Sequence, residues 1–436
     1  MKAKSLVGGG KLPAHHKATT MRVKSSIIFA LALSAILGTG CGKAKKTSSN
    51  EPQALTQAEE IVQARPLPAG AIPFDYAGHL YFDVIMRDTV AARMIFDTGN
   101  TEVLIDTHFF KEHFAPSPTL QRTLIQGAGN SLEAAYRDTA EWEYSVGEHH
   151  TTEQGATVLD LRKILGYHVD GMFGMEFMRG RKVEFNYADG YMLILPQDAQ
   201  PEEGYTCVKC KWLDNRQARM VMPVSIKIND EVALDGNFLV DMGSSGSLSL
   251  NSSVVAKLRL NRVLSDVRKK TYDTGGVGGS RTDYLFKADK VTVAGNELLN
   301  MQLNYSGNTQ GMMAEDSFDG LVGNGLLEHF DVVIDFAKCE IWLRPNRNFG
   351  ATKRYDSGMT LTPQADGWLV NGLTEGSNAH RAGVMRGDVI TSINGLTPRE
   401  VDIKRLKAMG YSEEDWSVVI KRNGSDEKIT FKKDKY

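Results

Sequence analysis

Asp97 and Asp241 are the two residues of this sequence whose type and setting best support chemistry. Each ends a short apolar segment (94–96 and 238–240), and each is followed by a glycine two positions later. Two carboxyl groups held close together cannot both ionise readily, so they share a proton. One form of the pair can then take a proton from water while the other gives one to a substrate. The pair predicts hydrolysis by an activated water, with Asp97 and Asp241 as catalytic groups and with no metal or cofactor.

The surroundings of these acids occur twice in the chain. The segment 170–194 aligns without gaps over 319–343, an offset of 149, while the two acids are 144 positions apart. The identical positions of the longer segment are Asp170/Asp319, Gly171/Gly320, Gly174/Gly323, Val183/Val332 and Ala188/Ala337. Two related elements in the same order at nearly the same offset indicate a duplicated lobe. The alignment of the two acid turns, at an offset of 144, places Leu104 opposite Leu248.

Other residues are expected to support the acid pair. Glycines permit close backbone approach, and short polar side chains hydrogen-bond nearby groups. The supporting residues expected from the repeat are Thr98, Gly99, Asn100, Gly243, Ser244, Gly174 and Gly323, with the side chains of Asn100 and Ser244 bonding the carboxylates. Two glycine-rich stretches between the repeated elements are expected to form mobile hairpin tips, at Gly127, Gly129, Gly276 and Gly278.

At these residues the sequence resembles the pepsin and retropepsin clan of aspartic proteases, over about 71–346. The resemblance implies two β-rich lobes (71–200 and 201–346), each with an Asp-Thr/Ser-Gly turn, a flap and an apolar-apolar-Gly strand beneath the turn. It also implies an endopeptidase that hydrolyses extended peptides. Met242 departs from the clan, whose hydroxyl at this position braces the opposite lobe, so only Thr98 can make its half of that brace.

A third Asp-Thr-Gly triplet begins at Asp273. The preceding residues, 268–271, are polar and basic rather than apolar, and glycines follow the triplet. This triplet is therefore expected to belong to the second flap and not to a catalytic site.

The C-terminal segment 355–436 resembles a PDZ domain of the type associated with bacterial proteases. The matching motifs are Ala382-Gly383-Val384, Arg386-Gly387-Asp388 and Ile393-Asn394-Gly395. The resemblance implies a site for a protein C-terminus, with Gly367 and Trp368 as peptide-binding residues. Asp366 would repel a terminal carboxylate there, so a structural or partner-docking role is an equal alternative.

Composition places the chain among ordinary globular proteins. It has 436 residues, of which 42% are hydrophobic and 24% charged, and this length predicts two or three folded units. Short alternating apolar runs at 80–86, 92–96, 224–228 and 237–240 predict a mainly β fold. The net charge is −2, so the chain has no excess of lysine and arginine of the kind that nucleic-acid binding needs. No nucleic-acid partner is therefore expected.

The N-terminal residues indicate export. Two basic residues and an apolar run within 21–41 predict a signal peptide, and the small residues before Cys41 resemble a lipoprotein cleavage site. Residues 1–41 are then a lipoprotein signal peptide with a possible upstream extension, and Cys41 is lipidated and becomes the mature N-terminus. Residues 42–70 form a flexible tether, and the protein is anchored in the bacterial envelope, in the outer membrane facing the periplasm. An ordinary secretory peptide with an incidental Cys41 is the alternative. Cys207 and Cys210 either form a local disulfide or remain two free thiols on a strand-rich segment.

Two other functions are compatible with some of these features. A non-catalytic peptide-binding lipoprotein, acting as a chaperone or scaffold, could use the same lobes and PDZ-like unit. A PDZ-bearing serine protease fits less well, because no Gly-Asn/Asp-Ser-Gly-Gly segment occurs.

Overall fold

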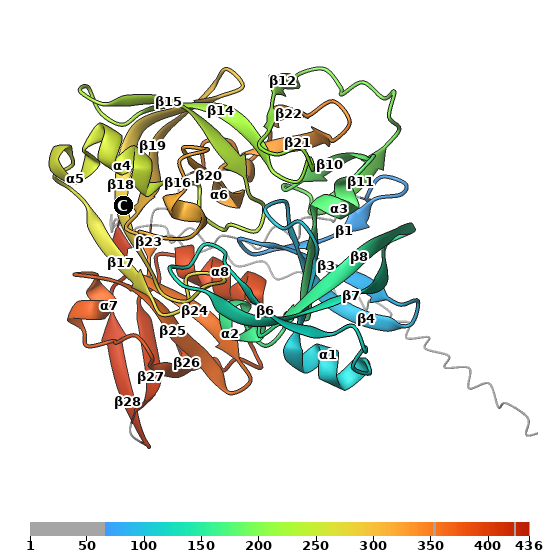
Figure 1. Ribbon diagram of the computed structural model, residues 1–436. Coiled ribbons are helices and arrows are strands. Elements are labelled where there is room, and N and C mark those ends of the chain that lie inside the picture. The colour runs from blue at the N-terminus through green and yellow to red at the C-terminus, as the bar shows by residue number, and fades with distance from the viewer. Residues whose placement is uncertain (1–65, 352–354, 423, 436) are drawn as a thin grey trace, which may run out of the picture. The chain divides into compact units, whose positions relative to one another are not determined.

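Strands account for 48% of the computed structural model and helices for 13%, which confirms a mainly β fold (Figure 1). The structure describes residues 66–351, 355–422 and 424–435. The expected signal segment (1–41), Cys41 and most of the expected tether (42–70) lie outside the described residues. Within the described ranges, no helix has the length and apolar character needed to cross a membrane.

The first β-sheet has the strand order β2-β3-β4-β9-β5-β8-β7-β6. The apolar runs expected at 80–86 and 92–96 lie in its β3–β4 hairpin, whose inward side chains alternate with outward ones. The strands are β2 (Asp75–Tyr76), β3 (Leu80–Met86), β4 (Val90–Asp97), β5 (Val103–Asp106), β6 (Gln121–Ile125), β7 (Glu133–Val146), β8 (His149–Leu159) and β9 (Gly171–Gly174).

The second β-sheet repeats this order strand for strand, as β13-β14-β15-β20-β16-β19-β18-β17. In both sheets the strand that leads to an aspartate runs parallel to the later glycine strand, with Met94 opposite Gly171 and Phe238 opposite Gly320. The sequence repeat is therefore also a repeat of topology. The strands are β13 (Lys211–Trp212), β14 (Met220–Lys227), β15 (Ala233–Val240), β16 (Leu248–Leu250), β17 (Arg268–Tyr272), β18 (Arg281–Val293), β19 (Asn296–Ser306) and β20 (Gly320–Val322).

The register of β5 and β16 corrects one sequence correspondence. Leu104 lies opposite Met172, and in the second sheet Ser249 lies opposite Leu321. Ser249 is therefore the structural equivalent of Leu104, and the expected match with Leu248 is wrong. The second acid turn is one residue longer than the first, and a shift of one residue moves a side chain to the other face of a strand.

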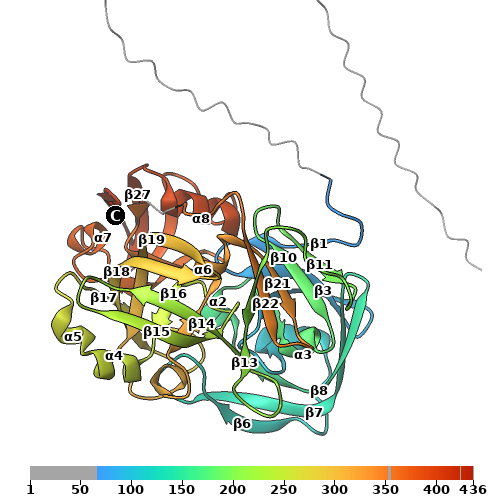
Figure 2. The same cartoon turned by 90° about the horizontal axis from the view of Figure 1, so that it is seen from above.

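A six-stranded sheet joins the two repeats in the order β1-β11-β10-β21-β22-β12. Strands β10 and β21 meet at its centre, where Glu184 lies opposite Val333, its own equivalent 149 positions later. This pairing places a local two-fold axis between the strands, which lie side by side in Figure 2. The strands are β1 (Ile72–Pro73), β10 (Lys182–Asn186), β11 (Tyr191–Leu195), β12 (Thr206–Lys209), β21 (Phe330–Asp335) and β22 (Glu340–Pro345).

Short helices connect the strands of the two repeats. The first is capped by Asp106, whose side chain accepts hydrogen bonds from the N–H groups of His108 and Phe109. The helices are α1 (Thr107–His113), α2 (Arg162–Leu165), α3 (Met175–Met178), α4 (Ser252–Leu258), α5 (Leu260–Val263) and α6 (Asn324–Leu327), with a 3₁₀ turn at Met312–Ala314.

Residues 355–435 form a C-terminal unit with its own core, which includes Trp368, Val370, Ile390 and Trp416. Neighbouring strands pair in the order β24-β25-β26-β27-β28, and β23 pairs with β29. The elements are β23 (Tyr355–Asp356), β24 (Met359–Gln364), β25 (Gly367–Thr374), α7 (Asn378–Arg381), β26 (Val389–Ile393), α8 (Ile403–Tyr411), β27 (Trp416–Arg422), β28 (Ser425–Phe431) and β29 (Asp434–Lys435).

The C-terminal unit is joined to the second sheet by a strand pairing. Strand β25 runs antiparallel to β17, with Thr271 opposite Leu373. Beyond the ladder, the side-chain oxygen of Asn371 accepts from the N–H and hydroxyl of Thr274, and its amide donates to the carbonyl of Thr274 at 2.8 Å. Asp273 forms an ion pair with Arg386. The unit is thus attached to the hairpin that carries the second glycine-rich tip.

Candidate active site

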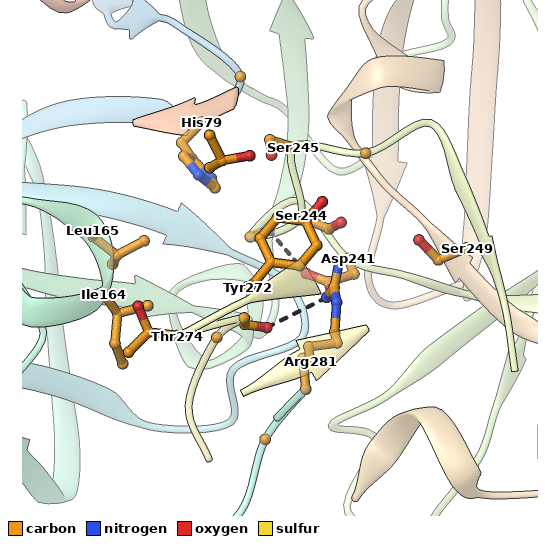
Figure 3. Close-up of a pocket in the computed structure, with 18 of the residues that line it drawn as sticks. His79, Ile164, Leu165, Asp241, Ser244, Ser245, Ser249, Tyr272, Thr274 and Arg281 are labelled. Atoms are coloured by element: carbon orange, nitrogen blue, oxygen red, sulfur yellow. Dashed lines mark hydrogen bonds between the residues drawn. The ribbon is translucent and has the colours of Figure 1, made fainter. Parts of the chain in front are cut away.

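The structure brings Asp97 and Asp241 together. Asp97 ends β4 and Asp241 follows β15, so each acid lies at the carboxyl end of the same strand of its repeat. Their carboxyl groups interact directly, since each one affects the pKa of the other. Asp241 is 7% exposed, and both acids line one cavity, which Figure 3 shows around Asp241.

Gly99 and Gly243 allow the two acid turns to approach this closely. A Cβ atom on Gly243 would lie 2.2 Å from the Cγ of Asp97, across the two-fold axis. A Cβ atom on Gly99 would lie 3.1 Å from an Asp97 oxygen and 3.2 Å from an Asp241 oxygen. The glycines expected from the sequence therefore stand at the contact between the two turns.

Thr98 makes the cross-brace expected of it. Its hydroxyl donates to the carbonyl of Val240 at 2.7 Å and accepts from the N–H of Met242 at 3.0 Å. Both partners belong to the opposite repeat. Met242 is fully buried, and its thioether cannot donate the symmetrical hydrogen bond back to the first repeat. The two repeats are therefore braced by one hydroxyl at this point.

Burial raises the pKa of both carboxyls above that of a solvated aspartate. The charge of Asp97 raises the pKa of Asp241 further, well above the ordinary value. Hydrogen bonds from the N–H groups of Gly99 and Gly243 act in the opposite direction on Asp97. The pair holds one proton over a wide pH range, because adding a second negative charge in this buried place is unfavourable.

Asn100 and Ser244 act through the backbone rather than through the expected side chains. Their N–H groups face the carboxyls of Asp97 and Asp241 respectively. The side-chain amide of Asn100 instead bonds the backbone of Glu102, two residues later. An Asx turn of this kind fixes the loop that follows the first acid.

Gly174 and Gly323 lie directly beneath the acid turns. A Cβ atom at Gly174 would be 1.9 Å from the carbonyl oxygen of Asp97, and one at Gly323 would be 2.4 Å from that of Gly246. Neither distance leaves room for a Cβ atom. Each strand can therefore lie this close beneath its turn only if the residue at this position is glycine.

The two glycine-rich tips meet over the cavity. The N–H of Gly129 donates to the carbonyl of Val277 at 2.9 Å, and that of Ser131 donates to the carbonyl of Gly278 at 2.8 Å. Cβ atoms at Gly127 and Gly129 would lie within 3 Å of the opposite tip. Gly276 and Gly278 have φ values of +111° and +103°, which side-chain-bearing residues rarely adopt.

The cavity has a volume of about 990 Å³ and extends from the acid pair to the C-terminal unit. Residues 359–363 of β24 and Ile403, Leu406 and Lys407 of α8 line it together with the acids and the tips. Trp368, expected to bind peptide, is 1% exposed and packs in the core of the unit. A Cβ atom on Gly367 would lie 2.6 Å from Val389, so this residue also packs internally.

Sequence reasoning missed three residues that line the same cavity as Asp241 and are labelled with it in Figure 3, namely His79, Tyr272 and Arg281. His79 precedes β3, and its Nδ1 has no hydrogen-bond partner among the described residues. Burial lowers the pKa of His79 to about 4, so the ring is neutral. No local motif marks these residues, because they reach the site only through the pairing of distant strands.

Two other groups of reactive residues lie outside the cavity. Asp106, His108 and Asp160 are close enough together to hold a metal ion, but the Asp106 carboxylate already caps α1 and pairs with Arg162. Cys207, Cys210 and Cys339 are free cysteines in the structure.

Comparisons of the chain with known proteins give no family assignment. No protein-family model matches it, and no curated protein matches it.

Proposed function

We propose that the chain is an aspartic endopeptidase that resembles the pepsin and retropepsin clan. One observation carries this proposal. Two buried carboxyls, each from the same turn of a repeated sheet, interact with each other in a cavity that two mutually hydrogen-bonded glycine-rich tips line.

The chemistry follows from the shared proton. A water molecule between the carboxyls gives one proton to the ionised carboxylate while its oxygen bonds to the peptide carbonyl carbon. The protonated carboxyl gives its proton to the carbonyl oxygen, which produces a tetrahedral diol. The C–N bond then breaks, the leaving nitrogen takes the proton that came from water, and one diol hydroxyl returns a proton to the other carboxylate.

The tips and hairpins favour a polypeptide substrate. Hydrogen bonds join the backbones of the two tips at the wall of the cavity, and breaking these few bonds would let the tips separate around a chain and rejoin over it. The tip residues that line the cavity are mostly small, which leaves room for an extended backbone to pass; they are Gly127, Ala128, Gly275, Gly276 and Val277.

The finer architecture belongs to the same proposal. The two sheets with their tips correspond to the two lobes, and residues 355–436 correspond to a PDZ-like unit that can hold a protein C-terminus or a partner. The chain is exported and anchored through a lipid on Cys41, facing the periplasm. Incorporation of a labelled fatty acid into the parent, and its loss in Cys41→Ala, tests the anchor.

Cleavage of a peptide library by the full chain from pH 3 to pH 9 tests the hydrolytic activity. Asp97→Asn and Asp241→Asn are each expected to lower kcat/KM by about 10²- to 10⁴-fold or more, and a pepstatin-type inhibitor is expected to block the parent. Asp235→Asn is the matched control, because Asp235 is an exposed acid on the strand that leads to Asp241.

Peptide binding without cleavage by the parent at any pH would contradict the enzyme proposal. That result would instead favour a non-catalytic peptide-binding lipoprotein, in which the buried acid pair serves only to hold the two turns together.

A further inference from the structure

The two sides of the cavity differ at positions that the internal repeat makes equivalent. On the first sheet, Leu104 of β5 lies opposite Met172 of β9 and opposite Thr157 of β8. On the second sheet, the corresponding positions are Ser249, Leu321 and Asn304. An apolar side chain at the centre of one side is therefore replaced by a hydroxyl on the other.

The first side is completed by residues from outside the first sheet. Partly buried apolar side chains line the cavity and pack against one buried cluster that includes Tyr81, Leu161 and Met172. We call these lining side chains the apolar pocket; they are Leu104, Ile125, Leu165, Val277 and Ile403. Ile125 belongs to the first flap hairpin, Val277 to the second tip, and Ile403 to α8 of the C-terminal unit.

Contacts made by the residues of α8 that follow Ile403 hold it in this position. The next residue, Lys404, forms an ion pair with Asp75 of the first sheet. One turn further along α8, Lys407 pairs with Glu328 and lies 3.7 Å from the ring centroid of Tyr76. These contacts fix the helix against both the first repeat and the chain that follows α6. Ile403 therefore forms a fixed part of the pocket wall.

The second side offers polar groups instead. Asn304 is 8% exposed and lines the cavity, and its Oδ1 accepts a hydrogen bond from the Ser249 hydroxyl at 2.9 Å. Its Nδ2 is buried and has no hydrogen-bond partner among the described residues. An unpaired buried donor is costly, and an acceptor supplied by a ligand would satisfy it.

We infer that the cleft selects polypeptides with unlike residues on the two sides of the cleaved bond. A bulky apolar side chain occupies the apolar pocket, and a side chain with a hydrogen-bond acceptor meets Asn304 on the other side. Ile403 is a specificity-determining residue, so the C-terminal unit contacts part of the substrate and contributes to its selection. This inference rests on the proposed endopeptidase function.

Peptide series that differ at one residue test the inference with the full chain. One series carries Leu or Ala on the apolar side, and another carries Gln or Leu on the polar side. Ile403→Ala is expected to reduce the preference for Leu over Ala, measured as a ratio of kcat/KM values, by about 10-fold or more. Asn304→Leu is expected to reverse the preference for Gln over Leu. Arg405→Ala, an exposed change on the same helix, is the control and leaves both ratios unchanged.

A second measurement separates this inference from the proposed function. The affinities of the same peptides are measured for Asp241→Asn, and for Asp241→Asn combined with Ile403→Ala or with Asn304→Leu. These measurements do not depend on cleavage. If the parent cleaves but both preferences survive Ile403→Ala and Asn304→Leu, the inference is overturned and the endopeptidase stands. If the parent does not cleave but the affinities follow the same two residues, the endopeptidase fails and the inference stands for binding.

Discussion

At the scale of single residues, the buried acid pair makes the stability of the protein depend on pH. Burial raises the pKa of both carboxyls in the folded protein, and the charge of Asp97 raises the pKa of Asp241 further. A group of this kind adds most to stability below the pKa of the unfolded carboxyl, and this contribution is lost as pH rises through the folded value. The parent protein is therefore expected to become less stable toward neutral and alkaline pH.

Asp241→Asn tests this pH dependence, because the amide keeps the shape of the carboxyl and removes the charge. The variant is expected to be inactive yet more stable than the parent at pH 8, with the difference shrinking toward pH 4. Urea unfolding at several pH values measures the free energy of unfolding. A difference that stays constant with pH would show that the pair is not strained by charge.

Thr98→Val tests the single cross-brace. The variant leaves the buried carbonyl of Val240 and the N–H of Met242 without the hydroxyl that bonds both. A loss of about 2–3 kcal/mol in the free energy of unfolding is expected. Thr101→Val, a change at a threonine without this bridging role, is the comparison, and an equally large loss there would remove the special role of Thr98.

The residue types around the acids were predictable, but their hydrogen bonds were not. The repeat identified Asp97, Asp241 and the four glycines that stand against the turns, because only glycine fits such close approach. The role of Asn100 was mistaken, since a short amide can bond either a carboxylate or its own loop with the same sequence. His79 was missed, because its place depends on the fold and not on a local pattern.

At the scale of elements, the two flap hairpins differ in how they are held. The tip of the first meets the second tip and residues 308–312, whereas the second is also paired with β25 along its own strand. Asn371 closes this attachment through three hydrogen bonds to Thr274.

Asn371→Ala is expected to loosen the second hairpin without unfolding the protein. Hydrogen exchange of residues 268–280 should accelerate, because local opening no longer has to break these bonds. Glu375→Gln removes only an exposed ion pair with Lys269 and is expected to change the exchange far less. Equal acceleration in both variants would mean that the ladder with β25, and not Asn371, holds the hairpin.

Strand positions were well predicted from alternation, but register was not. The run expected at 80–86 is β3 without change, whereas the match between Leu104 and Leu248 failed by one residue. An extra residue in a glycine- and serine-rich turn leaves no signal in the flanking apolar pattern. This single residue decides whether leucine or serine faces the cavity.

At the scale of the whole molecule, the six-stranded sheet unites the repeats around a buried ion pair. Lys182 of β10 lies 3.0 Å from Asp335 of β21, and the two side chains are 2% and 1% exposed. The Lys182 ammonium also donates to the carbonyls of Gln197 and Ala199. The pair thus ties the central strands to the chain that connects one repeat to the next.

Lys182→Met is expected to lower the free energy of unfolding by about 3–5 kcal/mol, because it leaves the buried Asp335 with only the more distant and half-exposed Lys338 ammonium, at 3.8 Å, as a cation nearby. The double variant Lys182→Met/Asp335→Asn should recover part of this loss, since no unpaired charge remains. Urea unfolding measures both. No recovery in the double variant would show that the cost comes from packing and not from charge.

The placement of the C-terminal unit was beyond reach of the sequence. Its motifs indicated a PDZ-like domain, but the ladder between β17 and β25 joins residues about a hundred positions apart, and each strand has an ordinary pattern taken alone. Only the structure shows that α8 lines the same cavity as the acid pair.

The ladder between β17 and β25 also bears on any shortened form of the protein. Cutting the chain before residue 355 would leave β17 as an exposed edge strand, whose unpaired amide and carbonyl groups could hydrogen-bond to strands of other molecules. Such an edge invites self-association between truncated copies. By pairing with β17, the C-terminal unit covers an edge strand that would otherwise favour aggregation. A fragment that ends near residue 350 is therefore a poor choice for expression.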